Sequence, residues 1–244
     1  MAFRVDDTVY VRRSLLAADD DNICPFYRTT IRHRWRRSAK MDKPDGTLSD
    51  WIATSKISSN FGVLIIRIGD FNEAGLLDPL AKSVLQYCRM LLPDDSVRMI
   101  ALRTELELTT LWDTFNGMCH QVIIVGHGGP EGYLFGQENI TSERLVKIFQ
   151  APNPAPKEFI SLGCQTGKAT FGKVFSSAAC VSHFIAPFHS VHGCNASLFT
   201  QTYLSERLLA SRTSKVAFNN ARDDLLGAAS FRLWKNGTLA AGPA

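Results

Sequence analysis

Two short apolar runs, each followed directly by a reactive side chain, decide the interpretation of this chain. Residues 122–129 read Val-Ile-Ile-Val-Gly-His-Gly-Gly, and residues 159–167 read Phe-Ile-Ser-Leu-Gly-Cys-Gln-Thr-Gly. Short β-branched and aromatic runs bounded by glycine predict buried strands. In an open parallel sheet, chemistry collects at the carboxyl edge, where the strands end. The pattern therefore predicts that His127 and Cys164 share one sheet edge, with the imidazole as general base for the thiol.

Segments of helical periodicity separate the strand-like runs along most of the chain. His127 and Cys164 lie 37 residues apart, which leaves room for one crossover helix between neighbouring strands. This alternation predicts an α/β fold, a three-layer sandwich of about six mainly parallel strands with helices on both faces. The orientation of the last strand, parallel or antiparallel, is left open. The expected strands are Phe61–Ile68, Val97–Leu102, Gln121–Val125, Phe159–Leu162, Phe184–Ala186 and Phe231–Trp234.

Three local signals predict where helices begin. Thr104 and Glu107 have the spacing of a capping box. Thr141 is placed as an N-cap, and its neighbour Ile140 has the spacing of a hydrophobic staple with Leu145. The pair Asp78-Pro79 predicts a helix that opens with a cap and a first-turn proline.

The composition is that of an ordinary globular protein. The chain has 244 residues, of which 45% are hydrophobic, and a formal net charge of +4. No run approaches the roughly 20 apolar residues of a membrane span. The first residues lack the basic-then-apolar order of a secretory signal, so the six cysteines are expected to be free thiols in the cytoplasm.

Residues 1–58 differ from the rest and are expected to form a basic N-terminal arm or small subdomain, with residues 59–244 as the main domain. Arginine and lysine are frequent between residues 28 and 43, and apolar positions there lack a clear period. Because the overall charge is mild and few aromatics interleave with the basic residues, a regulatory protein partner is expected rather than nucleic acid.

The two motifs resemble those of the caspase-like cysteine peptidases, and most closely the CHAT branch of the caspase and separase group. That family has one strand ending in His-Gly and a second ending in a cysteine among small residues. Where CHAT domains typically read Ser-Ala-Cys-Glu-Thr-Gly, residues 162–167 read Leu-Gly-Cys-Gln-Thr-Gly. The resemblance covers roughly residues 60–237. It departs at residues 189–193, where the family often has tryptophan and acidic residues and this chain has His-Ser-Val-His-Gly.

The resemblance implies a cysteine endopeptidase that hydrolyses a peptide bond in a protein substrate through a thioester, without metal or cofactor. Cys164 would be the nucleophile and His127 the general base, and the amides of Gly128 and Cys164 would form the oxyanion hole. It also implies control by a partner and a role in bacterial defence or cell-death signalling. The candidate residues for the substrate pocket are Arg67, Asp70, Gln165 and His189. An inward Asp70 would favour a basic residue before the cut, and an inward Arg67 an acidic one.

Other functions stay open from the sequence alone. The same groove would serve a catalytically silent scaffold that binds a partner peptide, and Cys164 would also suit hydrolysis or acyl transfer on a non-peptide ester. A zinc site built from His183, His189, His192 and Cys194 is disfavoured, because a companion pair of ligands is missing. The glycines at 126–129 are not followed by the helix that a nucleotide fingerprint needs. Loops at 130–136 or 153–156 are candidates for occluding the site.

Overall fold

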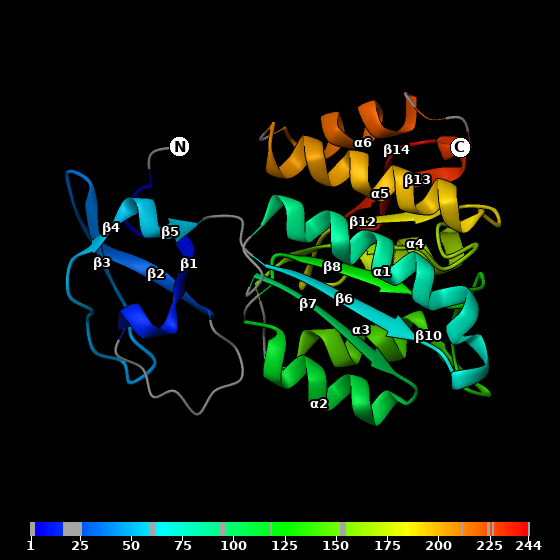
Figure 1. Cartoon of the computed structure of the whole chain (residues 1–244), viewed down its shortest axis with the longest axis horizontal. Coiled ribbons are helices and arrows are strands. Elements are labelled where there is room, and N and C mark those ends of the chain that lie inside the picture. The colour runs from blue at the N-terminus through cyan, green and yellow to red at the C-terminus, as the bar shows by residue number, and fades with distance from the viewer. Residues whose placement is uncertain are drawn as a thin grey trace.

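In a computed structural model of the chain, the described residues form a large central β-sheet, a small sheet made by the N-terminal residues, and a two-stranded hairpin (Figure 1). The structure describes residues 3–16, 26–58, 62–92, 96–117, 119–151, 155–210, 212–223, 225 and 227–243. Phe61, the predicted first residue of the first large-sheet strand, and residues 153–154 of the predicted loop lie outside these ranges.

The central sheet has seven strands in the order β14-β13-β12-β11-β8-β6-β7. Strands β12, β11, β8, β6 and β7 are parallel, and β13 and β14 are antiparallel to their neighbours. Their bounds are β6 Val63–Ile68, β7 Val97–Leu102, β8 Gln121–Val125, β11 Lys157–Ser161, β12 Val181–Pro187, β13 Phe231–Lys235 and β14 Thr238–Ala241. The predicted α/β class with a mainly parallel sheet is confirmed. The strand beyond the about six expected is β14, which returns along β13 as an edge hairpin.

Helices cover both faces of the central sheet, which explains why β6, β8 and β11 are buried along their whole length. On one face, α1, α5 and α6 pack through Val84, Phe199 and Phe218. On the other, α2, α3 and α4 enclose an aromatic cluster around Trp112 and Phe175. The helices are α1 Ala74–Leu91, α2 Glu105–Phe115, α3 Ser142–Gln150, α4 Ala169–Ser176, α5 Gly193–Leu208 and α6 Ser214–Asp223.

Two of the predicted helix starts are confirmed and one is wrong. The capping box at Thr104 is present in full, and the Thr141 side chain accepts a hydrogen bond from the amide of Arg144. In contrast, α1 begins at Ala74, and Pro79 lies inside it. The carboxylate of Asp78 does not cap a helix, because it is engaged by Arg67 on β6 and by Lys82 one turn further along α1.

The N-terminal residues form a five-stranded sheet in the order β4-β3-β2-β1-β5, with a core of its own. The strands are β1 Thr8–Arg12, β2 Phe26–Trp35, β3 Ser38–Met41, β4 Ile52–Ala53 and β5 Ile57–Ser58. This sheet lies beyond the amino ends of the central parallel strands (Figure 1). The buried Tyr10 of β1 donates a hydrogen bond to the carbonyl of Cys119, just before β8, at 3.3 Å. The small sheet is therefore anchored at the edge opposite His127 and Cys164.

A buried ionic cluster closes the amino edge of the central sheet. Glu158 on β11 accepts hydrogen bonds from the Arg207 guanidinium at 2.8 and 3.1 Å and from the hydroxyl of Ser214. Burial favours the neutral acid, but the Arg207 charge and these hydrogen bonds outweigh it and lower the pKa of Glu158 to about 2. The cluster thus fixes α5 and α6 to the middle of the sheet through a charge that stays ionised.

Candidate active site

His127 stands on a short loop that leaves β8 at the carboxyl edge and is held by a hairpin. The hairpin consists of β9 Gly132–Phe135 and β10 Glu138–Thr141. The carbonyl of His127 accepts a hydrogen bond from the amide of Leu134 at 2.9 Å, and the amide of Gly129 donates to the carbonyl of Gly132 at 2.8 Å. The His127 side chain is 42% exposed. The loop is therefore fixed by backbone bonds while the imidazole stays open to solvent.

Cys164 stands on a tight turn that leaves β11 at the same edge. A buried polar cluster lies beneath the turn. The Ser161 hydroxyl is hydrogen-bonded to both Tyr133 and Thr166, and it accepts from the amide of Gly163 at 3.2 Å. The hydroxyl of Thr166 donates in turn to the carbonyl of Gly163 at 2.8 Å. Cys164 is half-buried above this cluster.

The two loops are in direct contact. A Cβ atom added to Gly128 would lie 2.9 Å from the carbonyl oxygen of Cys164 and 2.9 Å from the carbonyl carbon of Gly163. A Cβ on Gly163 would lie 3.2 Å from the Cα of Gly128 and 2.7 Å from the ring of Tyr133. Only glycine fits at these two positions without a shift. The sequence-predicted pair of strand ends is therefore brought together by glycine-to-glycine packing.

Two amides at this contact are free to bind an oxygen. Gly128 faces Tyr133 in an isolated antiparallel bridge, and the bridge hydrogen bonds are made by the residues on either side of Gly128. Within the part of the chain that the structure describes, the amides of Gly128 and Cys164 donate to no acceptor. Amides of this kind form an oxyanion hole in enzymes where they lie beside a nucleophile.

A carboxylate contacts His127 that the sequence analysis missed. Oε1 of Glu73 lies 3.4 Å from Nε2 of His127, and the Glu73 side chain is 24% exposed. Its other oxygen accepts the amide hydrogen of Asp70 at 2.9 Å. Gly69 has a φ of 150°, and a Cβ there would lie 2.5 Å from Oε2 of Glu73, so this glycine leaves the space that the carboxylate fills. The only sequence signal was the position of Glu73 a few residues after the end of β6.

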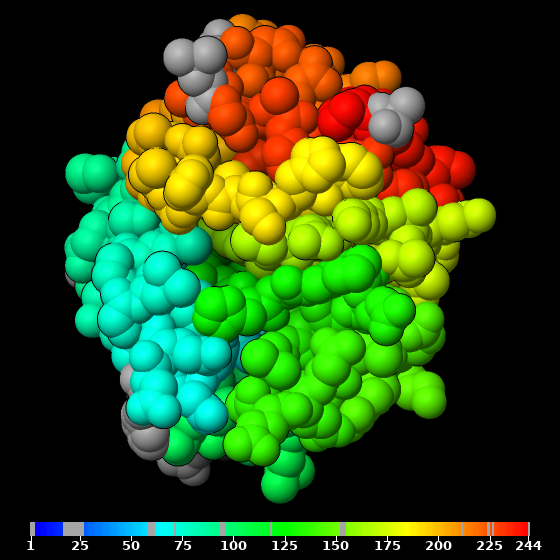
Figure 2. Space-filling view, turned by 90° about the vertical axis from the view of Figure 1, so that its right-hand side faces the viewer, coloured from blue at the N-terminus to red at the C-terminus, as the bar shows by residue number. Residues whose placement is uncertain are grey.

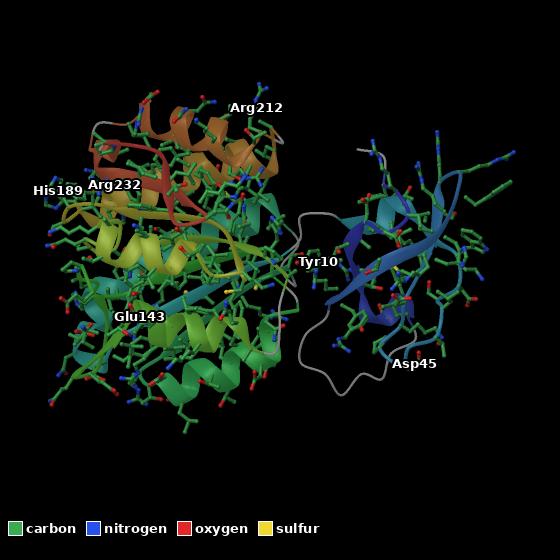
Figure 3. All side chains as sticks on the ribbon, turned by 180° about the vertical axis from the view of Figure 1, so that it is seen from behind. Tyr10, Asp45, Glu143, His189, Arg212 and Arg232 are labelled. Carbon is green, nitrogen blue, oxygen red and sulfur yellow. The ribbon has the colours of Figure 1, made fainter. Side chains whose placement is uncertain are left out.

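The four residues proposed from sequence for a substrate pocket separate into two kinds. Arg67 is buried, paired with Asp78 at 2.9 Å and bonded to the carbonyl of Gly69 at 2.7 Å, so it is fixed within the fold. The carboxylate of Asp70 is half-buried and forms no ion pair with another described residue; it lies beside Gly136 at the hairpin turn. Gln165 has a φ of 61°, and its amide donates to the carbonyl of His189 at 3.4 Å. His189 is exposed on the loop after β12, at the edge opposite Tyr10 (Figure 3).

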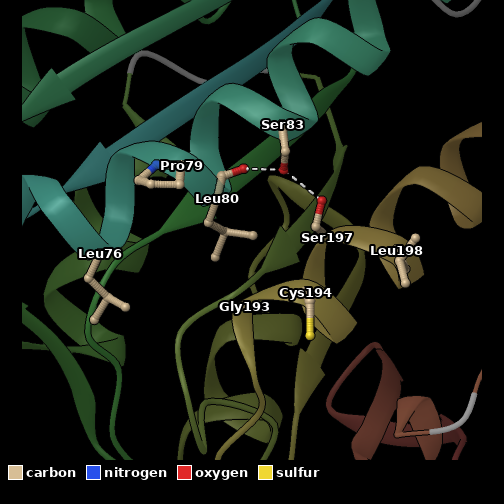
Figure 4. A pocket seen from close by; sticks show the side chains of 8 residues that line it. All are labelled: Leu76, Pro79, Leu80, Ser83, Gly193, Cys194, Ser197 and Leu198. Carbon is tan, nitrogen blue, oxygen red and sulfur yellow. Dashed lines mark hydrogen bonds between the residues drawn. The ribbon is translucent and has the colours of Figure 1, made fainter.

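The carboxyl edge as a whole is shown in Figure 2, where the start of α1 in cyan, the green loops after β8 and the yellow segment before α5 meet. A separate groove of about 470 Å³ lies on the helical face between α1 and α5 (Figure 4). A hydrogen bond of 2.6 Å joins Ser83 and Ser197 across it. The exposed Leu76 and Leu198 flank the groove, and none of the side chains that line it is charged.

No metal centre accompanies these residues in the described part of the chain, since no three His, Cys, Asp or Glu side chains there are placed to hold an ion. His183, one of the residues weighed for zinc, lies instead at the amino edge, 4.0 Å from Glu158. Its pKa is lowered by burial. No described helix is both long and apolar enough to cross a membrane.

Comparison with solved structures supports the fold. The chain is similar to a secreted C11 cysteine protease from Bacteroides thetaiotaomicron in complex with an irreversible peptide inhibitor, with a TM-score of 0.52 and 8% sequence identity. The match covers 72% of this chain and 66% of that one, slightly less than two thirds of the neighbour's length. A second structure of a secreted C11 protease from that organism, iotapain, gives a TM-score of 0.49 at 9% identity. No protein-family model matches the chain, and no curated protein is similar to it in sequence. The likeness therefore shows the caspase-like α/β fold.

Proposed function

We propose that this protein is a cysteine endopeptidase in which Cys164 is the nucleophile and His127 the general base. The observation that carries the proposal is the contact of the two strand-end loops through Gly128 and Gly163. It places an imidazole loop, a thiol turn and two free amides at one edge of the sheet. The similar fold of a C11 cysteine protease, whose structure holds an irreversible peptide inhibitor, supports the same chemistry.

The reaction follows from these groups. The Cys164 sulfur attacks the carbonyl carbon of the peptide bond while His127 takes the thiol proton. The amides of Gly128 and Cys164 donate to the oxyanion of the tetrahedral intermediate. Collapse of the intermediate breaks the C–N bond, and His127 gives its proton to the leaving amine. A water, deprotonated by His127, then hydrolyses the thioester and returns the free thiol and a carboxylic acid.

Glu73 extends this site as a positioning residue. Its carboxylate contacts Nε2 of His127 and is held from the other side by the amide of Asp70. A carboxylate in this place orients the imidazole and stabilises the imidazolium that forms when the thiol is deprotonated. It does not touch the reacting atoms.

Asp70 is the residue proposed to set substrate preference. The buried Arg67 is paired with Asp78, whereas the carboxylate of Asp70 has no ion-pair partner among the described side chains. An unpaired carboxylate beside the site favours a lysine or arginine before the cut. Gln165 and His189 form the opposite wall of the proposed pocket, joined by their backbone bond.

Three broader parts of the proposal rest on the sequence. The CHAT-type motif supports regulation by a partner protein and a role in defence or cell-death signalling. A cytoplasmic location fits the described cysteines at 88, 119, 164, 180 and 194, none of which forms a disulfide. Separation of cell fractions followed by detection of the protein tests the location directly.

The deciding experiment is mass spectrometry of new protein N-termini in cells that express the chain. The Cys164→Ala variant is the negative arm, and Cys194→Ala, which removes an exposed thiol outside the proposed site, is the matched control. New termini that appear with the wild type and Cys194→Ala but not with Cys164→Ala establish a peptidase, and the residues before each cut test Asp70. If the biological effect persists in Cys164→Ala, the protein is a binding scaffold and the proposal is wrong.

A further inference from the structure

The small N-terminal sheet carries a concentrated positive charge on one hairpin. Residues 28–43 contain seven arginines and lysines and a single acidic residue, Asp42. The exposed run at 32–37 reads Arg-His-Arg-Trp-Arg-Arg and forms the end of β2 and its turn into β3. We call residues 32–40 the basic hairpin. The basic stretch of the sequence therefore lies at one place in the fold.

Two tryptophans share the outer face of this hairpin and its neighbour β4. Ala39 pairs with Ile52, and both are buried, so the residues on either side of them point away from the core. Trp35 pairs with Ser38 on this outer face, and Trp51 precedes Ile52. Trp35 is 66% exposed and Trp51 is 49% exposed. Large aromatic rings left in solvent on one face indicate an interaction surface.

A cation accompanies each exposed ring. The guanidinium of Arg36 lies 5.9 Å from the ring centre of Trp35, and the ammonium of Lys40 lies 5.5 Å from that of Trp51. Each ring thus has a positive charge over one of its faces while much of the side chain stays exposed to solvent. The two other tryptophans of the chain, Trp112 and Trp234, are buried in the central core.

Most of the charge on the basic hairpin is unneutralised. Arg32 is paired with Asp42 at 2.8 Å and with Asp6 at 3.4 Å. The remaining four cations form no ion pair with another residue that the structure describes; they are Arg34, Arg36, Arg37 and Lys40. Three of the four are arginines, whose planar guanidinium matches the geometry of phosphate.

We propose that this face binds single-stranded nucleic acid. Backbone phosphates would contact Arg36, Arg37 and Lys40, and unpaired bases would stack on Trp35 and Trp51, which is the combination used for single strands. An acidic peptide would satisfy the charge but would leave both aromatic rings unused. The proposal departs from the sequence-based expectation, because only the register of β2, β3 and β4 shows that Trp35, Trp51 and Lys40 share a surface.

The location allows this surface to act beside the proposed peptidase site. Tyr10 anchors the small sheet to the amino edge of the central strands, and His189 marks the opposite, carboxyl edge (Figure 3). A strand bound to the basic hairpin would leave the carboxyl edge open. Binding is therefore expected to be independent of Cys164, so the two proposals fail or succeed separately.

The test is fluorescence anisotropy of labelled oligouridine and oligodeoxythymidine of about 16 nucleotides with the full chain. We expect binding whose affinity falls between about 50 and 200 mM salt, with a log–log slope of up to about 2 for three phosphate contacts. Arg36→Ala with Arg37→Ala should lower that slope by about 1.4. Trp35→Ala and Trp51→Ala should each weaken binding about 5-fold or more, since one stacked base is lost.

The controls separate this proposal from its rivals. Lys147→Ala with Lys215→Ala removes two exposed charges from the central domain and should leave affinity unchanged. Cys164→Ala should bind the oligonucleotides with the same affinity as the wild type. Comparison of oligouridine with oligodeoxythymidine shows whether the 2′-hydroxyl contributes to binding. Thermal unfolding confirms that each variant is folded, as expected for exposed positions. If neither oligonucleotide binds at low salt, or if polyglutamate competes fully and the tryptophan variants bind normally, the proposal is wrong.

Discussion

The contact between the histidine and cysteine loops predicts a large effect from the smallest substitution, Gly128→Ala. The new methyl group would lie 2.7 Å from Cγ2 of Thr166, 2.9 Å from the carbonyl oxygen of Cys164 and 2.9 Å from the carbonyl carbon of Gly163. Two of these three atoms belong to the backbone and cannot rotate away. The loops must therefore move apart, and the His127 loop is the one that carries the added atom.

The size of the effect follows from these distances. Ordinary contact begins near 3.4 Å, so the shortest contact must open by roughly 0.7 Å. Overpacking of this kind costs about 1–3 kcal/mol, which lowers the unfolding midpoint of a chain of this size by about 2–12 °C. Displacement of a catalytic group by ~1 Å costs up to about 100-fold in rate, so we expect peptide hydrolysis and Cys164 alkylation to slow by about 10- to 100-fold.

The assay is the alkylation of Cys164 by iodoacetamide, followed by mass spectrometry of the peptide that contains it, in a Cys194→Ala background. Gly129→Ala is the matched control, because a Cβ at Gly129 meets nothing within 4 Å. That variant should alkylate and unfold like its parent. Equal alkylation rates and equal unfolding midpoints for Gly128→Ala and Gly129→Ala would refute the conclusion that the two loops pack directly against each other at Gly128.

Further substitutions test other contacts. Glu73→Gln should lower kcat about 10-fold with little change in KM, whereas Glu131→Gln on the neighbouring exposed loop should leave both unchanged in steady-state assays of peptide hydrolysis. Because the folded pKa of Glu158 is about 2 and lies below the unfolded value, its stabilisation is complete above about pH 4.5 and is lost as pH falls toward 2. Denaturant titrations should therefore show Glu158→Gln less stable than wild type by about 3 kcal/mol at pH 7, with the difference shrinking over that acid range. Phe175→Ala should cost about 3–5 kcal/mol in similar titrations at pH 7, since the ring is fully buried among other aromatics.

Much of the central sheet is predictable because its strands have a continuous apolar signature. The runs at 122–125 and 159–160 are buried on both faces, so β-branched and aromatic residues follow one another without polar interruption. The glycines that end these runs also predict the edge at which His127 and Cys164 lie. The neighbouring positions of β8 and β11 then follow from the preference of crossover connections for adjacent strands.

Other parts of the site leave no such trace. Glu73 lies far from His127 in the sequence. Its carboxylate occupies space that Gly69 leaves open at a positive φ, and no periodicity in the sequence predicts this arrangement. A small subdomain was one of the two expectations for residues 1–58, but strands β2, β3 and β4 were not predicted. Their core rests on scattered residues such as Ile31 and Ala39, between which exposed basic side chains obscure the alternation. The start of α1 was predicted at the wrong residue because Asp78-Pro79 has the sequence of a helix cap. In the fold, the carboxylate of Asp78 pairs with Arg67 instead of capping the helix.

Tyr133 has a consequence for how the molecule could be switched off. Its backbone faces Gly128, its ring packs on Gly163, and its hydroxyl bonds to Ser161 beneath the cysteine turn. This one residue of the β9–β10 hairpin thus supports both the loop of His127 and the turn of Cys164. A ligand that displaced this hairpin would release the imidazole loop and the thiol turn together, so loss of activity would be concerted rather than gradual.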